Sequence, residues 1–224
     1  MPPLQPPTLL LLQLILHSAE AVYTRGLIID AGSLGSRLHI YQWDADAAAN
    51  VLNFPTTDES WTAIMQPGIA SFAGSPGKVK DHLSSLMQYA QSTLRHEAHL
   101  WRSYPIYFKA TGGMRQLPHD EREDIMSEVR ELLTNRSFCP FHFERKFARI
   151  ISGEEEAVFS WLAANYLLKS FDETGKMNSS FGTLDLGGAS TQIAFSVESQ
   201  DISESMFRLQ MSNPSSGLNF WIKF

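Results

Sequence analysis

The sequence predicts an α/β fold with mixed sheets that contains the same strand–turn–strand unit twice. Along the 224 residues, short runs rich in β-branched residues alternate with segments of helical periodicity, which is the pattern of α/β proteins. Tight glycine-containing turns join two pairs of these runs, and such hairpins make the sheets mixed. Residues 29–32 (IDAG) also coincide with residues 184–187 (LDLG) at an offset of 155. An internal repeat of this kind indicates a duplicated unit.

The first half of the chain is predicted to form a hairpin, a long helix and a third strand. Residues 26–30 and 38–42 are β-rich and flank a tight turn. Residues 53–77 are rich in turn formers and show little periodicity. Apolar residues of segment 78–100 recur at i, i+3 and i+4, which predicts one amphipathic helix. Residues 105–110 (PIYFKA) form a short strand of the buried type that leads into a Thr-Gly-Gly turn.

The second half continues the alternation of helices and strands. A helix is expected after Pro118, because Asp120, Glu121 and Glu123 suit the positive end of a helix dipole. A strand at 148–151, a helix at 154–168 and a final hairpin at 183–197 follow. The second hairpin is the repeated unit.

Composition and charge exclude several classes of protein. The chain is 43% hydrophobic and 19% charged, as in ordinary globular proteins, so its bulk is not disordered, collagen-like or coiled-coil. Its 18 Lys and Arg against 24 Asp and Glu give a net charge of −6, which argues against a nucleic-acid partner held by phosphate neutralisation. Anions would therefore be bound by backbone N–H groups, a metal or a few placed side chains.

The N-terminus is expected to be a secretory signal peptide, residues 1–21. It contains an apolar run at 9–16 and ends in Ala19-Glu20-Ala21, a small-x-small cleavage site. A buried helix and an uncleaved anchor are the alternatives. No other segment approaches 18 apolar residues, so no stable membrane span is expected after cleavage. The mature chain would lie in the secretory pathway, in the Golgi or ER lumen or outside the cell, and the glycosylation sequons at Asn135 and Asn178 agree with this.

The single cysteine, Cys139, excludes an intrachain disulfide framework and a cysteine-based zinc site. Secreted proteins usually pair their thiols. Cys139 is therefore either buried and inert or separated from a partner that this chain does not contain.

The two Asp-x-Gly turns have the composition of phosphate-binding loops. Glycine and serine let successive backbone N–H groups converge on an anion, and an aspartate at the end of the preceding strand can hold a divalent cation through water. One such hairpin can arise for purely local reasons of turn formation. Two copies suggest a shared purpose, in which the facing turns clamp a polyphosphate.

Four segments resemble the signature regions of the apyrase family, the nucleoside triphosphate diphosphohydrolases. They occur in the family's order, and the resemblance covers residues 26–197. The first segment, with Gly35 and Arg37, resembles the soluble or Golgi-type and plant branches more than the ecto-enzymes with two membrane anchors. The segments are 30–37 (DAGSLGSR), 109–115 (KATGGMR), 151–168 (beginning ISGEEEAVFSW) and 184–193 (LDLGGASTQI).

The resemblance implies the actin and sugar-kinase type of fold, which is ribonuclease H-like, with two duplicated lobes and a nucleotide in the cleft between them. Residues 22–150 would form the N-terminal lobe and residues 151–224 the start of an incomplete C-terminal lobe, because residues 212–224 no longer resemble the family. It also implies hydrolysis of nucleoside tri- or diphosphates to lower phosphates with Ca²⁺ or Mg²⁺.

Matching the motifs gives each site residue an expected role. Glu156 matches the catalytic base, and Ser190 and Gln192 match the pair that positions the attacking water. Asp30 and Asp185 match the residues that hold the hydrated metal, and Thr111 approaches that metal. The phosphate-binding positions are Ser33, Gly35, Ser36, Gly187, Gly188 and Ala189.

Simpler interpretations of these residues exist. Glu156 could be a first-turn carboxylate that the helix dipole favours, and Ser190 and Gln192 could form the solvated face of a strand. Arg37 and Arg115 could hold loops by salt bridges or touch phosphate. For the chain as a whole, the alternative is a truncated, catalytically inactive product that binds nucleotide or a partner; polyphosphate hydrolysis is a more distant one.

Overall fold

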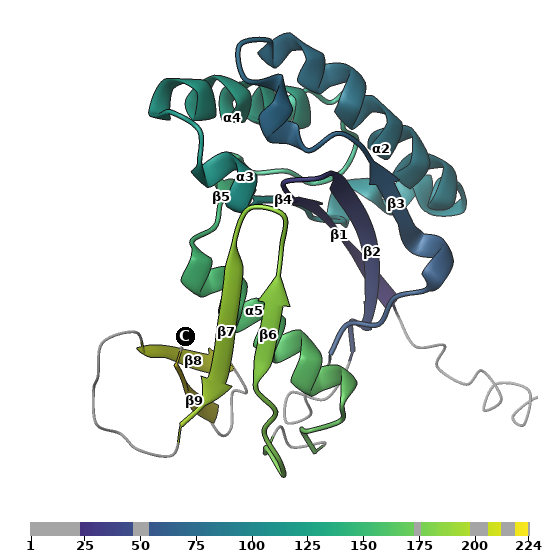
Figure 1. Ribbon diagram of the computed structural model, residues 1–224. Helices are drawn as coiled ribbons and strands as arrows, with labels where there is room; N and C mark the ends of the chain where they lie inside the picture. The colour runs from purple at the N-terminus through teal and green to yellow at the C-terminus, as the bar shows by residue number, and fades with distance from the viewer. Residues whose placement is uncertain (1–22, 47–53, 173–175, 198–205, 212–217, 224) are drawn as a thin grey trace, which may run out of the picture.

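The computed structural model describes residues 23–46, 54–172, 176–197, 206–211 and 218–223 (Figure 1). The predicted signal peptide lies outside the described residues. Strands and helices alternate along the chain and form two sheets, one of five strands and one of four. The predicted α/β class is confirmed. The five-stranded sheet is mixed, as predicted, whereas the described pairs of the four-stranded sheet are all antiparallel.

The first sheet has the strand order β3-β2-β1-β4-β5. β1 (Tyr23–Ala31) pairs antiparallel with β2 (Ser36–Asp44), as the predicted hairpin requires, and parallel with β4 (Ile106–Ala110). β5 (Ala148–Ile150) extends the parallel part. At the other edge lies β3 (Thr62–Met65), which is not among the predicted elements because four residues are too few to show alternation.

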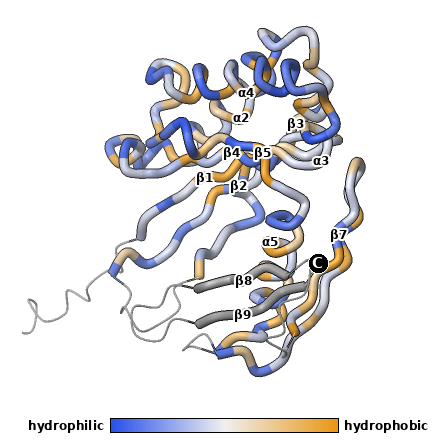
Figure 2. Tube along the Cα trace, turned by 90° about the vertical axis from the view of Figure 1, so that its left-hand side faces the viewer, coloured by the Kyte–Doolittle hydropathy of each residue, from blue (hydrophilic) through white to orange (hydrophobic). Residues whose placement is uncertain are grey.

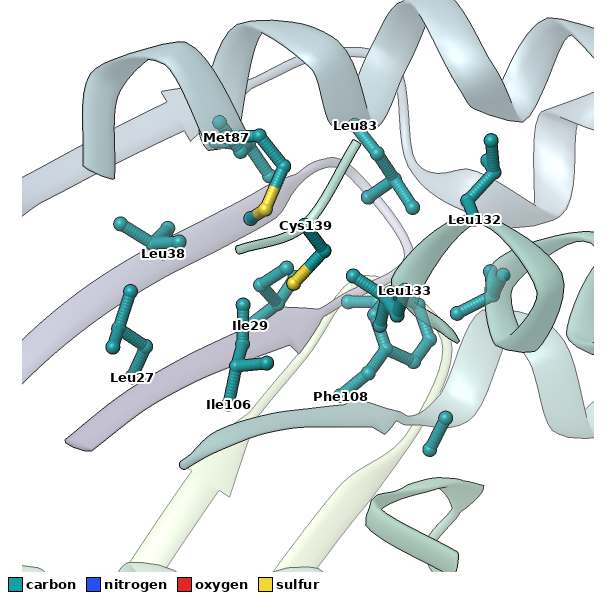
Figure 3. Packing of buried hydrophobic residues seen from close by; sticks show 14 of the residues in the cluster. Leu27, Ile29, Leu38, Leu83, Met87, Ile106, Phe108, Leu132, Leu133 and Cys139 are labelled. Carbon is teal, nitrogen blue, oxygen red and sulfur yellow. The ribbon is translucent and has the colours of Figure 1, made fainter. Parts of the chain in front are cut away.

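Two long helices cover one face of this sheet (Figure 1). α2 (Val79–Thr93) and α4 (His119–Thr134) pack against each other, and α2 also contacts β2. Their apolar residues meet those of the strands in the main hydrophobic core (Figure 3). The fully buried strand residues of this core include Leu27, Ile29, Leu38, Ile40, Ile106 and Phe108.

The predicted helix over residues 78–100 is too long. α2 ends at Thr93, and a 3₁₀ helix follows it (Arg95–Ser103). Glu97 has a non-helical backbone (φ −108°), and its carboxylate accepts hydrogen bonds from Arg25 at 3.0 Å and from the Tyr104 hydroxyl at 2.6 Å. The regular α-helix therefore does not continue through Glu97, whose side chain contacts residues outside α2. The apolar periodicity of the sequence does not show such contacts.

Cys139 lies inside the main core beside Ile29 and Leu133 (Figure 3). It is a free thiol with no exposed surface, and burial raises its pKa to about 11. Its burial is confirmed, and a thiol of such high pKa is a poor nucleophile, which agrees with the buried and inert alternative.

The second sheet has the order β6-β7-β9-β8. β6 (Thr183–Leu186) and β7 (Thr191–Ser196) form the predicted second hairpin. α5 (Gly153–Leu167) packs on them and starts with a capping box between Ser152 and Glu155. β8 (Met206–Met211) and β9 (Leu218–Lys223) are not among the predicted elements. Within the described residues, no helix has the length and apolar character needed to cross a bilayer.

The two hairpins share one register, which confirms the repeat. In the first, Asp30 lies opposite Arg37 and Ala31 opposite Ser36. In the second, Asp185 lies opposite Gln192 and Leu186 opposite Thr191. Every one of these positions is displaced by the same 155 residues. Each hairpin therefore presents an aspartate one residue before the end of its first strand, followed by a turn of small residues.

Candidate active site

The turns of the two hairpins meet the start of α3 (Gly112–Arg115) and α5 around a cavity of about 230 Å³. In Figure 1 the tip of the β6–β7 hairpin reaches the ends of β4 and β5. The walls combine carboxylates, hydroxyls and glycine backbone from all these elements. The cavity is lined by Asp30, Gly32, Ser33, Leu34, Gly35, Arg37, Thr111, Gly112, Glu156, Asp185, Leu186, Gly187, Gly188, Ala189 and Ser190.

Glycines allow the turns to approach this closely. A Cβ atom on Gly188 would lie 2.6 Å from Oγ of Ser33. A Cβ atom on Gly112 would lie 2.8 Å from Oγ of Ser190. Side chains at either position would separate the loops, so the closed arrangement depends on glycine.

The predicted base and the two predicted water-positioning residues lie together. Nε2 of Gln192 donates to Oγ of Ser190 at 2.8 Å and to Oε2 of Glu156 at 3.3 Å. Gln192 is only 8% exposed, so it does not belong to a solvated strand face. Glu156 stands in the first turn of α5 and lines the cavity with Ser190.

Arg115 joins this cluster, although it is not among the predicted site residues. Its Nη2 donates to Oε2 of Glu156 at 2.8 Å and to Oγ of Ser190 at 3.0 Å, and its Nη1 donates to the carbonyl of Ile151 at 3.0 Å. The only sequence signal for it is its place at the end of the 109–115 segment. Its partners are 36 to 75 residues away in the sequence.

Two carboxylates face the cavity from equivalent positions of the two hairpins. Burial raises the pKa of Asp30, the Arg37 guanidinium at 3.6 Å partly opposes this, and the charge of Asp185 acts in the same direction as burial. Oδ2 of Asp185 accepts a hydrogen bond from Ser160 at 2.6 Å. The hydroxyl-bearing Thr111 lines the same wall and is nearly buried.

This donor set fits a divalent cation held through water. Two partly buried carboxylates that repel each other are stabilised by a cation between them. Among the described residues, no group of three or more His, Cys, Asp or Glu side chains could ligate a metal directly. Asp30, Asp185 and Thr111 offer few oxygen ligands, whereas a hard cation takes about six to eight, so the arrangement suits a cation that keeps much of its water.

Five of the six predicted phosphate-binding residues line the cavity: Ser33, Gly35, Gly187, Gly188 and Ala189. Ser36 does not. Its side chain is fully buried, and its Oγ is hydrogen-bonded to Nε2 of His82 at 2.9 Å. The Ser36 side chain therefore does not face the cavity, because β2 has already begun there and turns it towards α2.

Sequence comparison identifies the family. A model of the GDA1/CD39 (nucleoside phosphatase) family matches residues 16–218. The chain belongs to this family. The GDA1/CD39 chain is 40% identical over 182 residues to the Golgi apyrase of Schizosaccharomyces pombe, covering 76% of this chain and 31% of that protein. It is 37% identical over 170 residues to the guanosine-diphosphatase of the same yeast, covering 75% of this chain and 29% of that protein.

The chain thus spans about three-tenths of the length of these curated relatives. Among solved structures, nucleoside triphosphate hydrolases from Neospora caninum are similar, with a TM-score of 0.61 and 18% identity over 96% of this chain and 47% of that chain. This similarity shows the predicted actin-like fold of two related lobes.

Proposed function

We propose that this GDA1/CD39 chain hydrolyses nucleoside tri- and diphosphates to lower phosphates and inorganic phosphate, with Ca²⁺ or Mg²⁺. The observation that carries the proposal is the contact of Glu156 and Ser190 through Gln192, beside a cavity that Glu156 and Ser190 line. Asp30 and Asp185 line the same cavity. Phosphoryl transfer to water needs positioning and charge neutralisation rather than a covalent nucleophile. These residue types supply both.

Glu156 is assigned as the general base. Oxygen of the attacking water forms a bond to the terminal phosphorus, the bridging P–O bond breaks, and the Glu156 carboxylate takes the water proton. Oγ of Ser190 accepts hydrogen bonds from Arg115 and Gln192. Its own O–H proton is therefore free to be donated, and Ser190 and Gln192 together orient the water.

The two turns are assigned to the phosphates. Ser33 and Gly35 contribute from the first hairpin, and Gly187, Gly188 and Ala189 from the second. Backbone N–H groups of such turns bind anions without a basic side chain, which explains how a chain of net charge −6 could bind a polyphosphate. Asp30, Asp185 and Thr111 are assigned to the waters of the cation, which when bound neutralises developing phosphate charge.

The direct test is phosphate release from ATP, ADP, GDP and UDP, measured with Ca²⁺ or Mg²⁺ and then with a chelator. We expect release that the chelator abolishes, and a loss of at least about 10²-fold in kcat for Glu156→Gln, since general-base catalysis contributes about that much. Glu154→Gln is the matched control, because Glu154 shares the first turn of α5 but does not line the cavity. If wild type and Glu156→Gln release no phosphate while both bind nucleotide, the enzymatic assignment is wrong.

A second candidate function is non-enzymatic. The chain would then bind nucleotide or a partner without turnover. The exposed apolar residues of the second hairpin, Leu184, Leu186, Ile193 and Phe195, favour this candidate, since large apolar patches often mark interaction surfaces. A chain that binds nucleotide but releases no phosphate in the assay above would support this candidate over the enzymatic one.

The relatives' names also support a location. One is called a Golgi apyrase, and we infer that this chain acts in the Golgi or ER lumen or outside the cell as a glycoprotein. Asn135 and Asn178 are both exposed, as glycosylation requires. Digestion of the secreted chain with a glycan-removing amidase should lower its apparent mass, and the variant with both asparagines changed to Gln should show no such shift.

The lobe boundary is assigned between residues 150 and 151. β5 ends at Ile150 inside the first sheet, whereas α5 packs on the second hairpin. Residues 22–150 would be the N-terminal lobe and residues 151–224 the beginning of the C-terminal lobe. Proteolysis that cuts near residue 151 and leaves a stable fragment 22–150 would support the division.

A further inference from the structure

The Arg115 guanidinium connects three segments that the proposed reaction needs in one place. Ile151 lies between β5 and α5, Glu156 lies in α5, and Ser190 lies in the turn of the second hairpin. Arg115 itself ends α3. All three hydrogen bonds measure 2.8 to 3.0 Å. A planar guanidinium presents its donors in a fixed geometry, so it fixes the relative positions of its acceptors.

Oε2 of Glu156 is the oxygen that Arg115 holds. Within the described part of the chain, Oε1 accepts no hydrogen bond from protein. One oxygen is therefore anchored, and the other is available to a water. The bond from Arg115 already restricts the rotamers of the Glu156 side chain. The side chain therefore loses less conformational entropy when the reaction occurs.

Arg115 does not line the cavity, in contrast to Arg37, Glu156 and Ser190. Its donors point to protein acceptors, and its side chain is 23% exposed. This geometry favours an action through Glu156 and Ser190 over direct contact with phosphate.

We propose that Arg115 is a positioning residue, which orients the Glu156 carboxylate and the Ser190 hydroxyl towards the attacking water across the two lobes. The inference rests on the proposed function. It predicts a defect in the chemical step rather than in nucleotide binding, because Arg115 does not line the cavity itself and its donors bond the two residues assigned to the water.

The test compares kcat and KM for phosphate release by Arg115→Ala, Arg115→Lys and a matched control, Arg130→Ala. Arg130 has the same 23% side-chain exposure and also bonds a glutamate and a backbone carbonyl, but these partners, Glu123 and Ala148, do not line the cavity, unlike Glu156 and Ser190. For Arg115→Ala we expect kcat to fall roughly 10²-fold, as misplaced catalytic groups cost about that much, with KM nearly unchanged. Added guanidinium ion should restore part of the loss.

Arg115→Lys should keep less than wild-type kcat, because one ammonium cannot replace three fixed donors. Arg130→Ala should retain the wild-type kcat and KM. If Arg115→Ala does not fold, Arg115→Lys and Arg115→Gln replace it in the test. A lower kcat with nearly unchanged KM in these variants supports the inference.

An increase in KM at constant kcat would overturn the inference in favour of substrate contact, and unchanged kinetics would overturn it outright. A wild-type chain that releases no phosphate refutes the proposed function and this inference together. An active wild type with an unaffected Arg115→Ala refutes only the inference.

Discussion

The two hairpins have the same register but different surroundings. In the first, Ile29 and Leu38 are fully buried beneath α2 and α4. At the positions 155 residues later, Leu184 is 73% exposed and Ile193 is 57% exposed. β7 lies apart from α2 and α4, with hydrophobic residues along it (Figure 2).

On the opposite faces of the hairpins, the second hairpin is the more buried of the two. α5 covers the face of the second hairpin that carries Gln192 and Ala194, both of which are buried. The equivalent residues of the first hairpin, Arg37 and His39, are exposed or half-buried. The comparison teaches that one local pattern can be stabilised from either side, and that burial depends on which helix lies against the hairpin.

The largest expected effect tests this difference in cover directly. Leu38→Ala should lower the free energy of unfolding by about 2–5 kcal/mol, as cavity-forming substitutions do. Ile193→Ala, the equivalent change in the second hairpin, should cost about 0.5 kcal/mol or less, as exposed sites do. Urea unfolding of both variants measures the two costs. Similar losses would show that the second apolar face is covered in solution.

An intermediate effect is expected where the two hairpins touch. Gly188→Ala places a Cβ atom against Ser33 and Leu34 and should cost about 1–3 kcal/mol of overpacking, together with an increase in KM for nucleotide. Gly153→Ala is the control, since no atom lies within 4 Å of a Cβ there. Thermal unfolding and phosphate-release kinetics give both values. A wild-type KM in Gly188→Ala would contradict the contact between the turns.

The smallest effect concerns α5, the helix that covers the second hairpin. Nη1 and Nη2 of Arg149 each bond the Glu155 carboxylate at 2.6 Å and hold the pKa of Glu155 below its ordinary value of 4.5. Because the pKa of Glu155 is lowered in the folded state, the ion pair stabilises the fold at pH values above the ordinary pKa. This stabilisation is lost as the pH falls through the lowered pKa. Because both side chains are partly solvated, the gain is about 1 kcal/mol or less.

Glu155→Gln keeps the capping box and should lower the melting temperature slightly at pH 7. The difference from wild type should disappear once the pH lies below the lowered pKa of Glu155. A difference that persists unchanged at acid pH would mean that the ion pair is not its source.

Much of the fold followed from local patterns in the sequence. Both hairpins, α4 and α5 were predicted because alternation, helical periodicity and first-turn acids act over a few residues. The shared offset of 155 also gave the equivalence of Asp30 with Asp185, and the motif resemblance gave the family. The short strands β3, β8 and β9 and the end of α2 were missed, because pairing and packing with distant elements decide them.

The sequence by itself determined the residue types of the candidate site, whereas only the tertiary structure decided how they meet. Ser36 turned into the core beside His82, and Arg115 reached Glu156 and Ser190, which are 41 and 75 residues away. The apolar residues of both hairpins were equally evident in the sequence. Which of them lost contact with water depended on where the helices packed, because the hydrophobic effect acts on surface that the whole fold either covers or leaves open.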